Sequence, residues 1–134
     1  MIYLDSTALI KLIRADPLTP ALTTYLQPRA EGTTLFSCAI TRAELVRAAA
    51  HLHPDAIGHA QHLLSGLDLV AVTDRLLDAA IALDPAPPRI VDALHLAAAL
   101  TAGLQLRTVL TYDSDLTAAA AALHIPTICP GGAP

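Results

Sequence analysis

Short apolar runs alternate along the chain with longer segments in which apolar residues recur every three or four positions. The short runs predict buried strands, and the longer segments predict amphipathic helices. Thr73 is the expected N-cap of its helix, and the proline-rich segment 84–88 predicts a stiff connector. The alternation indicates an α/β fold with a mostly parallel central sheet of four or five strands flanked by helices. Strands are predicted at residues 2–4, 35–40, 69–72, 107–111 and 126–129, and helices at 6–14, 19–26, 41–51, 56–64, 73–83, 89–101 and 114–123.

Four acidic residues lie far apart in the chain, each close to a junction between a strand and a helix: Asp5, Glu44, Asp92 and Asp113. In an open α/β sheet, residues at the carboxyl ends of the strands converge on one crevice, where ligands bind. Carboxylates that lie close together raise one another's pKa unless a cation neutralises them. Ligands that offer only oxygen suit Mg²⁺ or Mn²⁺. The pattern therefore suggests metal-assisted phosphodiester chemistry.

Each acid also has an explanation that needs no metal. Glu44 follows Thr41 at the spacing of a capping box, and the first turn of a helix favours any acid at Asp92. Asp5 could cap the helix that follows it. One residue of the pair Asp113 and Asp115 is expected to be an N-cap, and Asp115 is the preferred choice. Taken together, the four acids are harder to explain as caps, because all of them fall at one edge of the predicted sheet.

Composition and charge limit the class of protein. With 134 residues, the chain predicts one domain, residues 1–134, with a loosely ordered tail over about 130–134. Hydrophobic residues make up 54% and charged residues 15%, which excludes a disordered chain. The apolar helical run 93–105 is shorter than the ~20 residues that span a bilayer. The first residues lead directly into a strand without a signal peptide, so a cytoplasmic protein is expected.

The net charge of −4 argues against a broad basic surface for nucleic acid. If four of the twelve acids hold metal ions, the rest of the surface is close to neutral. The high apolar content instead suggests contact with another protein chain. Aromatic residues make up only 3%, which argues against a stacking platform for long single strands. A structured RNA with a cleavable loop is therefore the preferred class of nucleic-acid substrate.

Four segments match a known family: residues 2–9 (IYLDSTAL), 41–45 (TRAEL), 89–97 (RIVDALHLA) and 110–116 (LTYDSDL). With this order and spacing, the chain resembles the PIN-domain ribonucleases, and among them the toxin half of bacterial VapBC toxin–antitoxin pairs. The resemblance implies a three-layer fold and four acids, Asp5, Glu44, Asp92 and Asp113, that hold Mg²⁺ or Mn²⁺. It also implies a homodimer and a cognate antitoxin that occupies the catalytic groove. The order Ser6 then Thr7 departs from the family, which often has threonine first.

Further residues are expected to support such a site. Ser6 and Thr111 flank the acids, and His95 lies one helical turn after Asp92, where it either bonds a carboxylate or packs in the interior. Asp115 is expected to be peripheral. Arg42 and Arg89 lie near the acids and are candidates for contact with RNA phosphates, although helix-surface solvation or ion pairing would also explain them.

Three rival interpretations remain open at this point. A zinc site would use the histidines at 51, 53, 59 and 62, and a polar helix surface explains the same residues. A phosphate-transfer receiver domain would need a lysine at a strand end, but the chain's single lysine, Lys11, falls inside the first predicted helix. A catalytically silent protein-binding module would use the four acids only as helix caps. Thermal stabilisation by Mn²⁺ would separate that module from a metal-binding site.

Overall fold

A computed structural model describes residues 1–27 and 32–132, and within them five strands form one sheet. All pairings are parallel, and the strand order is β3-β2-β1-β4-β5. The strands are β1 (Ile2–Leu4), β2 (Leu35–Cys38), β3 (Asp68–Val70), β4 (Thr108–Leu110) and β5 (Thr127–Ile128). The predicted parallel α/β sheet is therefore confirmed.

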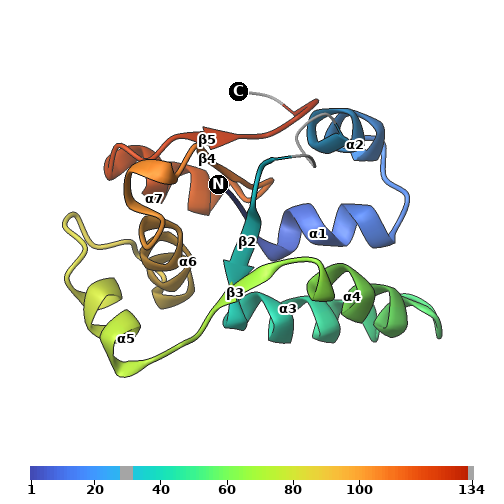
Figure 1. The fold of residues 1–134 in the computed structure, drawn as a ribbon, viewed down its shortest axis with the longest axis horizontal. Coiled ribbons are helices and arrows are strands. Elements are labelled where there is room, and N and C mark those ends of the chain that lie inside the picture. Colours follow the sequence, from blue (N-terminus) through green and yellow to red (C-terminus); the bar gives the residue numbers. More distant parts are fainter. Residues whose placement is uncertain (28–31, 133–134) are drawn as a thin grey trace.

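Helices cover both faces of this sheet (Figure 1). One layer contains α1 (Ser6–Ile13), α2 (Thr19–Leu26), α3 (Ala39–Ala49) and α4 (Ala56–Ser65). The other contains α5 (Asp74–Ile81), α6 (Ile90–Leu100) and α7 (Ser114–Ala122). The molecule thus has the expected three layers. In the described part of the chain, no helix is both long and apolar enough to cross a bilayer.

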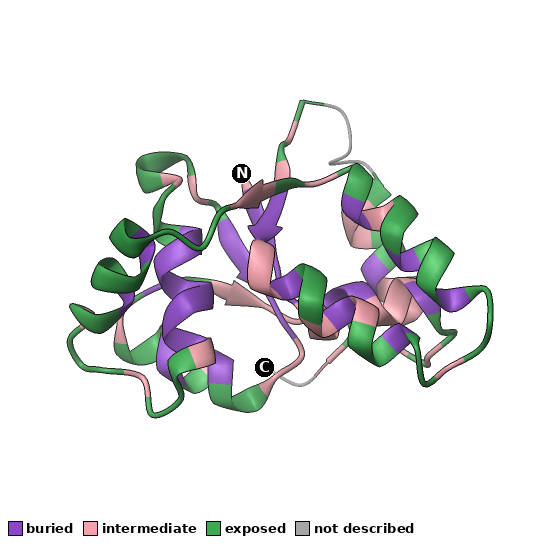
Figure 2. Cartoon of the chain, turned by 90° about the horizontal axis from the view of Figure 1, so that it is seen from below, coloured by how far each residue is buried: buried purple, intermediate pink, exposed green. Residues whose placement is uncertain are grey.

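The alternation of side chains along the strands divides the core into two clusters. Ile2 and Leu4 of β1 pack with the α1–α4 layer, whereas Tyr3 between them packs with the α5–α7 layer. Helix α6 is deeply enclosed, because every residue from Asp92 to Ala99 is buried (Figure 2). An acid on this helix therefore enters the interior of the protein.

The beginning of α3 differs from the prediction. The helix starts at Ala39, because Cys38 already has the extended backbone of an N-cap (φ −107°, ψ 153°). Thr41 lies inside the first turn, fully buried, where its hydroxyl accepts a hydrogen bond from Ser37. The capping box, which was the alternative explanation for Glu44, is therefore excluded, and Glu44 lies in the middle of the helix.

Other boundaries follow the predictions more closely. Thr73 is the N-cap of α5, where its hydroxyl accepts from the amide of Leu76. The loosely ordered tail was predicted to begin at about residue 130, but Pro130 is buried and its carbonyl accepts a hydrogen bond from Tyr112 at 2.9 Å. Residues 133 and 134 lie outside the described part.

Candidate active site

The four predicted acids line one cavity of about 290 Å³ at the carboxyl edge of the sheet. They arrive from four places in the chain: the end of β1, the middle of α3, the first turn of α6 and the residue before α7. The predicted convergence is therefore found in the structure. The complete lining is Asp5, Ser6, Thr7, Glu44, Arg89, Ile90, Val91, Asp92, His95, Asp113 and Leu116.

Asp5 lies at the floor of the cavity, with only 3% of its surface exposed. The parallel register of β1 and β4 makes Asp5 and Thr111 neighbours, and Thr111 donates a hydrogen bond to Oδ2 of Asp5 at 2.5 Å. Thr7 Oγ1 and the amide of Ala8 donate to Oδ1 at 2.6 and 3.0 Å, so Asp5 also caps α1. Burial raises the pKa of Asp5, and the three hydrogen bonds offset that rise only in part. A cation nearby would complete the stabilisation of this carboxylate.

Asp92 is bound by a guanidinium group. Arg89 donates to its two carboxylate oxygens from Nε at 2.7 Å and from Nη2 at 2.8 Å, the bidentate geometry that makes arginine–carboxylate pairs strong. The same Nη2 donates to Asp113 at 2.8 Å, and Nη1 lies 3.6 Å from Asp115. These hydrogen bonds raise the pKa of Arg89, which therefore carries a permanent positive charge among the acids.

Asp113 both faces the cavity and caps α7. Its Oδ1 accepts from the amides of Asp115 and Leu116, while Oδ2 meets Arg89. The prediction that Asp115 would be the cap is therefore wrong, because Asp113 has the extended backbone that the position requires. Partial burial raises the pKa of Asp113, but the hydrogen bonds from Arg89 and from these two amides outweigh it and leave the pKa below its usual value. Asp115 is 72% exposed at the rim, as expected for a peripheral residue.

Glu44 is held by a histidine from the other helical layer. His95 Nε2 lies 2.8 Å from Glu44 Oε1, and His95 Nδ1 lies 2.7 Å from the hydroxyl of Tyr3. The bond to a carboxylate, one of the two alternatives for His95, is therefore present, and it goes to Glu44. Since His95 is also buried, both suggested roles apply to it.

The remaining candidates divide into residues near the acids and residues away from them. Thr111 binds Asp5 as predicted, and Ser6 lines the cavity. The hydroxyl of Thr7 was not among the predicted site residues, although its position two residues after a helix-capping Asp is a recognisable local signal. Arg42 is exposed on α3 and is not among the residues that line the cavity. Arg89 is paired with acids, which was the ion-pairing alternative.

The rival sites receive no support from the geometry. His51, His53, His59 and His62 are all exposed, and in residues 1–27 and 32–132 no three histidine, cysteine or acidic side chains are grouped tightly enough to hold a metal ion. The same holds for the acids of the cavity, where the guanidinium of Arg89 is bound to Asp92 and Asp113. Lys11 pairs with Asp16 at 3.4 Å and lies over the ring of Tyr112; it is not among the cavity residues.

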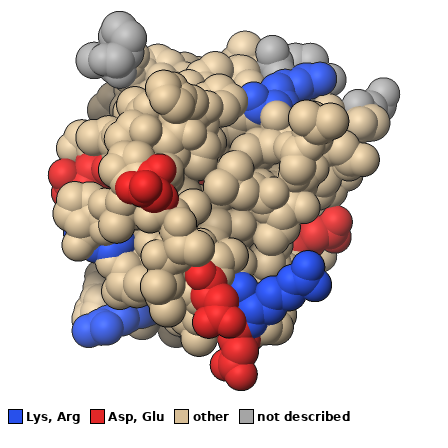
Figure 3. All heavy atoms as spheres, turned by 90° about the vertical axis from the view of Figure 1, so that its left-hand side faces the viewer, with Lys and Arg blue, Asp and Glu red and all other residues tan. Residues whose placement is uncertain are grey.

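Charged groups are sparse on one face of the molecule. The face over α5–α7 carries scattered groups of both signs within a mostly uncharged surface (Figure 3). On this face, the surface resembles neither a continuous basic stripe for nucleic acid nor an acidic patch.

Comparisons with known proteins point to one family. A family model described as the PIN domain matches residues 2–122. Ribonuclease VapC46 of Mycobacterium tuberculosis (strain ATCC 25618 / H37Rv) is 39% identical over 129 residues, which cover 96% of this chain and 97% of that protein. Two solved structures share the fold: a toxin–antitoxin complex from Klebsiella pneumoniae (TM-score 0.69, 18% identity, 97% and 98% of the two chains), and the M. tuberculosis toxin VapC20, described as cleaving the sarcin–ricin loop (TM-score 0.67, 19% identity, 89% and 95%).

Proposed function

Because the chain belongs to the PIN-domain family of VapC-type ribonucleases, we propose that it is the toxin of a toxin–antitoxin pair. Its activity would be the endonucleolytic hydrolysis of RNA with Mg²⁺ or Mn²⁺. The observation that carries the proposal is the meeting of four carboxylates from four separate elements in one cavity. Helix caps alone would not need to face a common space.

The donor groups of the cavity fit such an ion. The four proposed ligands all offer carboxylate oxygens, which hard divalent cations prefer. Arg89 already stands in for a cation, since its guanidinium binds Asp92 and Asp113 together. Its side chain is 47% exposed and can turn outward without unfolding the site. Asp5, Glu44, Asp92 and Asp113 would then hold the ion, which when bound activates a water molecule and offsets negative charge on the scissile phosphate.

The chain's own residues would fix the geometry of the reaction. Thr7 and Thr111 hold Asp5 so that its carboxylate cannot rotate. Once Arg89 is displaced from Asp92 and Asp113, it lies at the rim with its fork of donors free to bind a phosphate oxygen of the substrate. Arg42, exposed on the same helix as Glu44, is the second candidate for a phosphate contact.

A structured RNA with a cleavable loop is the proposed substrate class. The scarcity of aromatic side chains disfavours the stacking of a long single strand. Without a broad basic surface, recognition would depend on the shape of the RNA and on a few contacts near the cavity. The structural relative VapC20 is described as cleaving one RNA loop, which is a substrate of this class.

The proposed partners are a cognate antitoxin and a second copy of the chain, and the proposed location is the cytoplasm. The antitoxin would occupy the catalytic groove, where the contacts of Arg89 indicate that the acids accept a cationic side chain. Large apolar side chains that remain exposed, such as Ile81 (72%), offer a surface for chain contact.

The test is cleavage of total bacterial RNA by the purified protein with Mg²⁺ or Mn²⁺ and with EDTA. Asp5→Asn is the informative variant, because asparagine also caps helices and so preserves the fold while removing the charge. Asp78→Asn, an exposed acid on α5, is the matched control. We expect discrete metal-dependent fragments from the wild type and from the control, and none from Asp5→Asn.

Fragments that persist in EDTA or in Asp5→Asn would contradict the proposal. If antitoxin-free protein cleaves nothing and Mn²⁺ does not raise its thermal stability, the alternative of a silent PIN-like binding module holds instead.

A further inference from the structure

The four carboxylates of the cavity are held in different ways. Asp5 and Asp113 accept hydrogen bonds from the amides of the helices that they cap, and Asp92 is bound by Arg89 of its own segment. Glu44 instead projects from the middle of α3 and is 33% exposed. The contact that fixes it comes from His95 on α6, in the opposite helical layer (Figure 1).

The contacts of His95 define the orientation of its ring. A carboxylate oxygen accepts hydrogen bonds, so Nε2 is the donor in its contact with Glu44. On the other side of the ring, Nδ1 lies 2.7 Å from the hydroxyl of Tyr3. With the ring proton on Nε2, Nδ1 is the acceptor, so the hydroxyl of Tyr3 is the donor in this contact.

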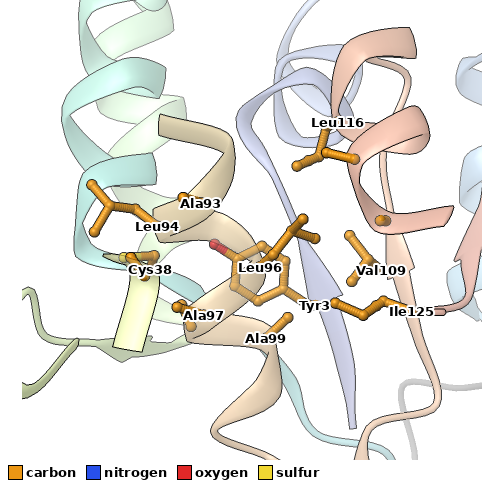
Figure 4. Packing of buried hydrophobic residues seen from close by; sticks show 14 of the residues in the cluster. Tyr3, Cys38, Ala93, Leu94, Leu96, Ala97, Ala99, Val109, Leu116 and Ile125 are labelled. Atoms are coloured by element: carbon orange, nitrogen blue, oxygen red, sulfur yellow. The ribbon is translucent and has the colours of Figure 1, made fainter. Parts of the chain in front are cut away.

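Tyr3 in turn is fixed by the core. It is completely buried, with its ring edge-on to Phe36 at 5.2 Å and to His95 at 5.9 Å between ring centres. Figure 4 shows the ring among α6 and β4 side chains, including Leu96 and Val109, with the hydroxyl pointing toward the beginning of α6. A rigid residue of the central strand thus orients His95.

We propose that His95 is a positioning residue, which aims the carboxylate of Glu44 into the cavity for metal binding, and that Tyr3 holds His95 in place. The inference rests on the proposed function, since it assumes that Glu44 is a metal ligand. Without the bond, the rotatable side chain of Glu44 would sample solvent, and the site would lose a preorganised ligand.

Two substitutions at residue 95 separate positioning from packing. In His95→Gln, the side-chain amide nitrogen reaches roughly the place of Nε2 and can still donate to Glu44. In His95→Asn, the shorter side chain can reach only toward Tyr3. Leu96→Val is the control, because Leu96 is buried on the same helix but is not among the cavity residues.

Mn²⁺ affinity of the full chain, measured by calorimetry, is the main readout, alongside the midpoint of thermal unfolding. We expect His95→Asn to weaken Mn²⁺ binding by about 10–100-fold, the usual effect of losing a residue that orients a ligand. His95→Gln should recover most of the affinity. Leu96→Val should lower the unfolding midpoint and leave the affinity unchanged. In a Glu44→Gln background, His95→Asn should cause no further loss of affinity, because both changes remove the same interaction.

The outcomes that overturn the inference differ from those that overturn the proposed function. A wild-type chain that binds no Mn²⁺ would refute the metal site, and the inference with it. Normal wild-type binding that His95→Asn leaves unchanged, or weakens equally in the Glu44→Gln background, would refute the inference alone. Should His95→Asn fail to fold, nitrogen-15 NMR of the wild-type imidazole decides: a protonated Nε2 is expected, and an unprotonated Nε2 would overturn the inference.

Discussion

Thr111 offers the sharpest test of how the acidic site is stabilised. Its hydroxyl is fully buried and donates to the buried carboxylate of Asp5 at 2.5 Å, and it also accepts from the amide of Asp113 at 3.0 Å. Thr111→Val keeps the shape and the preference for extended backbone but removes both interactions. A hydrogen bond to a charged group contributes about 1.5–3 kcal/mol. We therefore expect the free energy of unfolding to fall by about 2 kcal/mol, and Tm by roughly 6–10 °C for a domain of this size.

The loss of stability in Thr111→Val should depend on pH, because Thr111 donates to the carboxylate of Asp5. Burial raises the pKa of Asp5 above its value in the unfolded chain, so the folded protein binds this proton more tightly. The contribution of Asp5 to the free energy of unfolding therefore decreases as the pH rises through the folded pKa, and recovers as the pH falls. Loss of the Thr111 donor raises this pKa further, so the variant should lose most stability at neutral pH and less under acidic conditions.

Urea unfolding of the metal-free protein in EDTA, at neutral pH and at about pH 5, measures both quantities. Thr108→Val is the matched control, since Thr108 is buried on the same strand and donates only to the carbonyl of Pro126, at 3.3 Å. This neutral hydrogen bond should contribute about 0.5–1.5 kcal/mol and show no dependence on pH. If Thr111→Val costs no more than Thr108→Val, or costs the same at both pH values, Thr111 does not stabilise the ionised form of Asp5.

Three further predictions address the cation, the core and the thiols. Arg89→Ala frees Asp92 and should tighten Mn²⁺ binding to the isolated protein in calorimetry; weaker or unchanged binding would show that Arg89 does not compete with the ion. Leu96→Ala should lower the free energy of unfolding by about 2–5 kcal/mol, because Leu96 is fully buried, and a near-zero effect in urea would contradict its tight packing. Cys38 is buried, with a pKa raised by burial, so iodoacetamide should label the partly exposed Cys129 first; equal rates by mass spectrometry would contradict that burial.

The fold could be predicted from the sequence because its signals are local. Each strand is a short apolar run, flanked by segments in which apolar residues recur at helical spacing. The side chains at positions 2 to 4 alternate between the two core clusters, as an extended backbone requires. The acids Asp5 and Asp92 could be placed for the same reason, since each follows or begins an element with a clear pattern. The parallel register of β1 and β4 then places Asp5 beside Thr111.

The contacts that hold Glu44 could not be predicted in this way. The spacing of Thr41 and Glu44 matched a capping box, but α3 begins at Ala39, so Thr41 lies inside the first turn with its hydroxyl bonded to Ser37. Similarly, Tyr3 and His95 are 92 positions apart, and nothing in either local pattern points to the other. In both cases the structure depends on tertiary contacts, which local sequence patterns do not reveal.

The contacts that hold each acid determine which side chains would have to move if a metal ion replaced Arg89 in the cavity. Asp5 and Asp113 bond the first turns of α1 and α7, so neither carboxylate can move far without losing the cap of its helix. Arg89 is different, because its side chain is half exposed and can leave Asp92 and Asp113 by rotation alone. Leaving costs the guanidinium little, since water replaces its hydrogen bonds, whereas the acids then need another positive charge. If the site binds a metal ion as proposed, the ion would replace the guanidinium of Arg89 while the carboxylates of Asp5 and Asp113 stay in place.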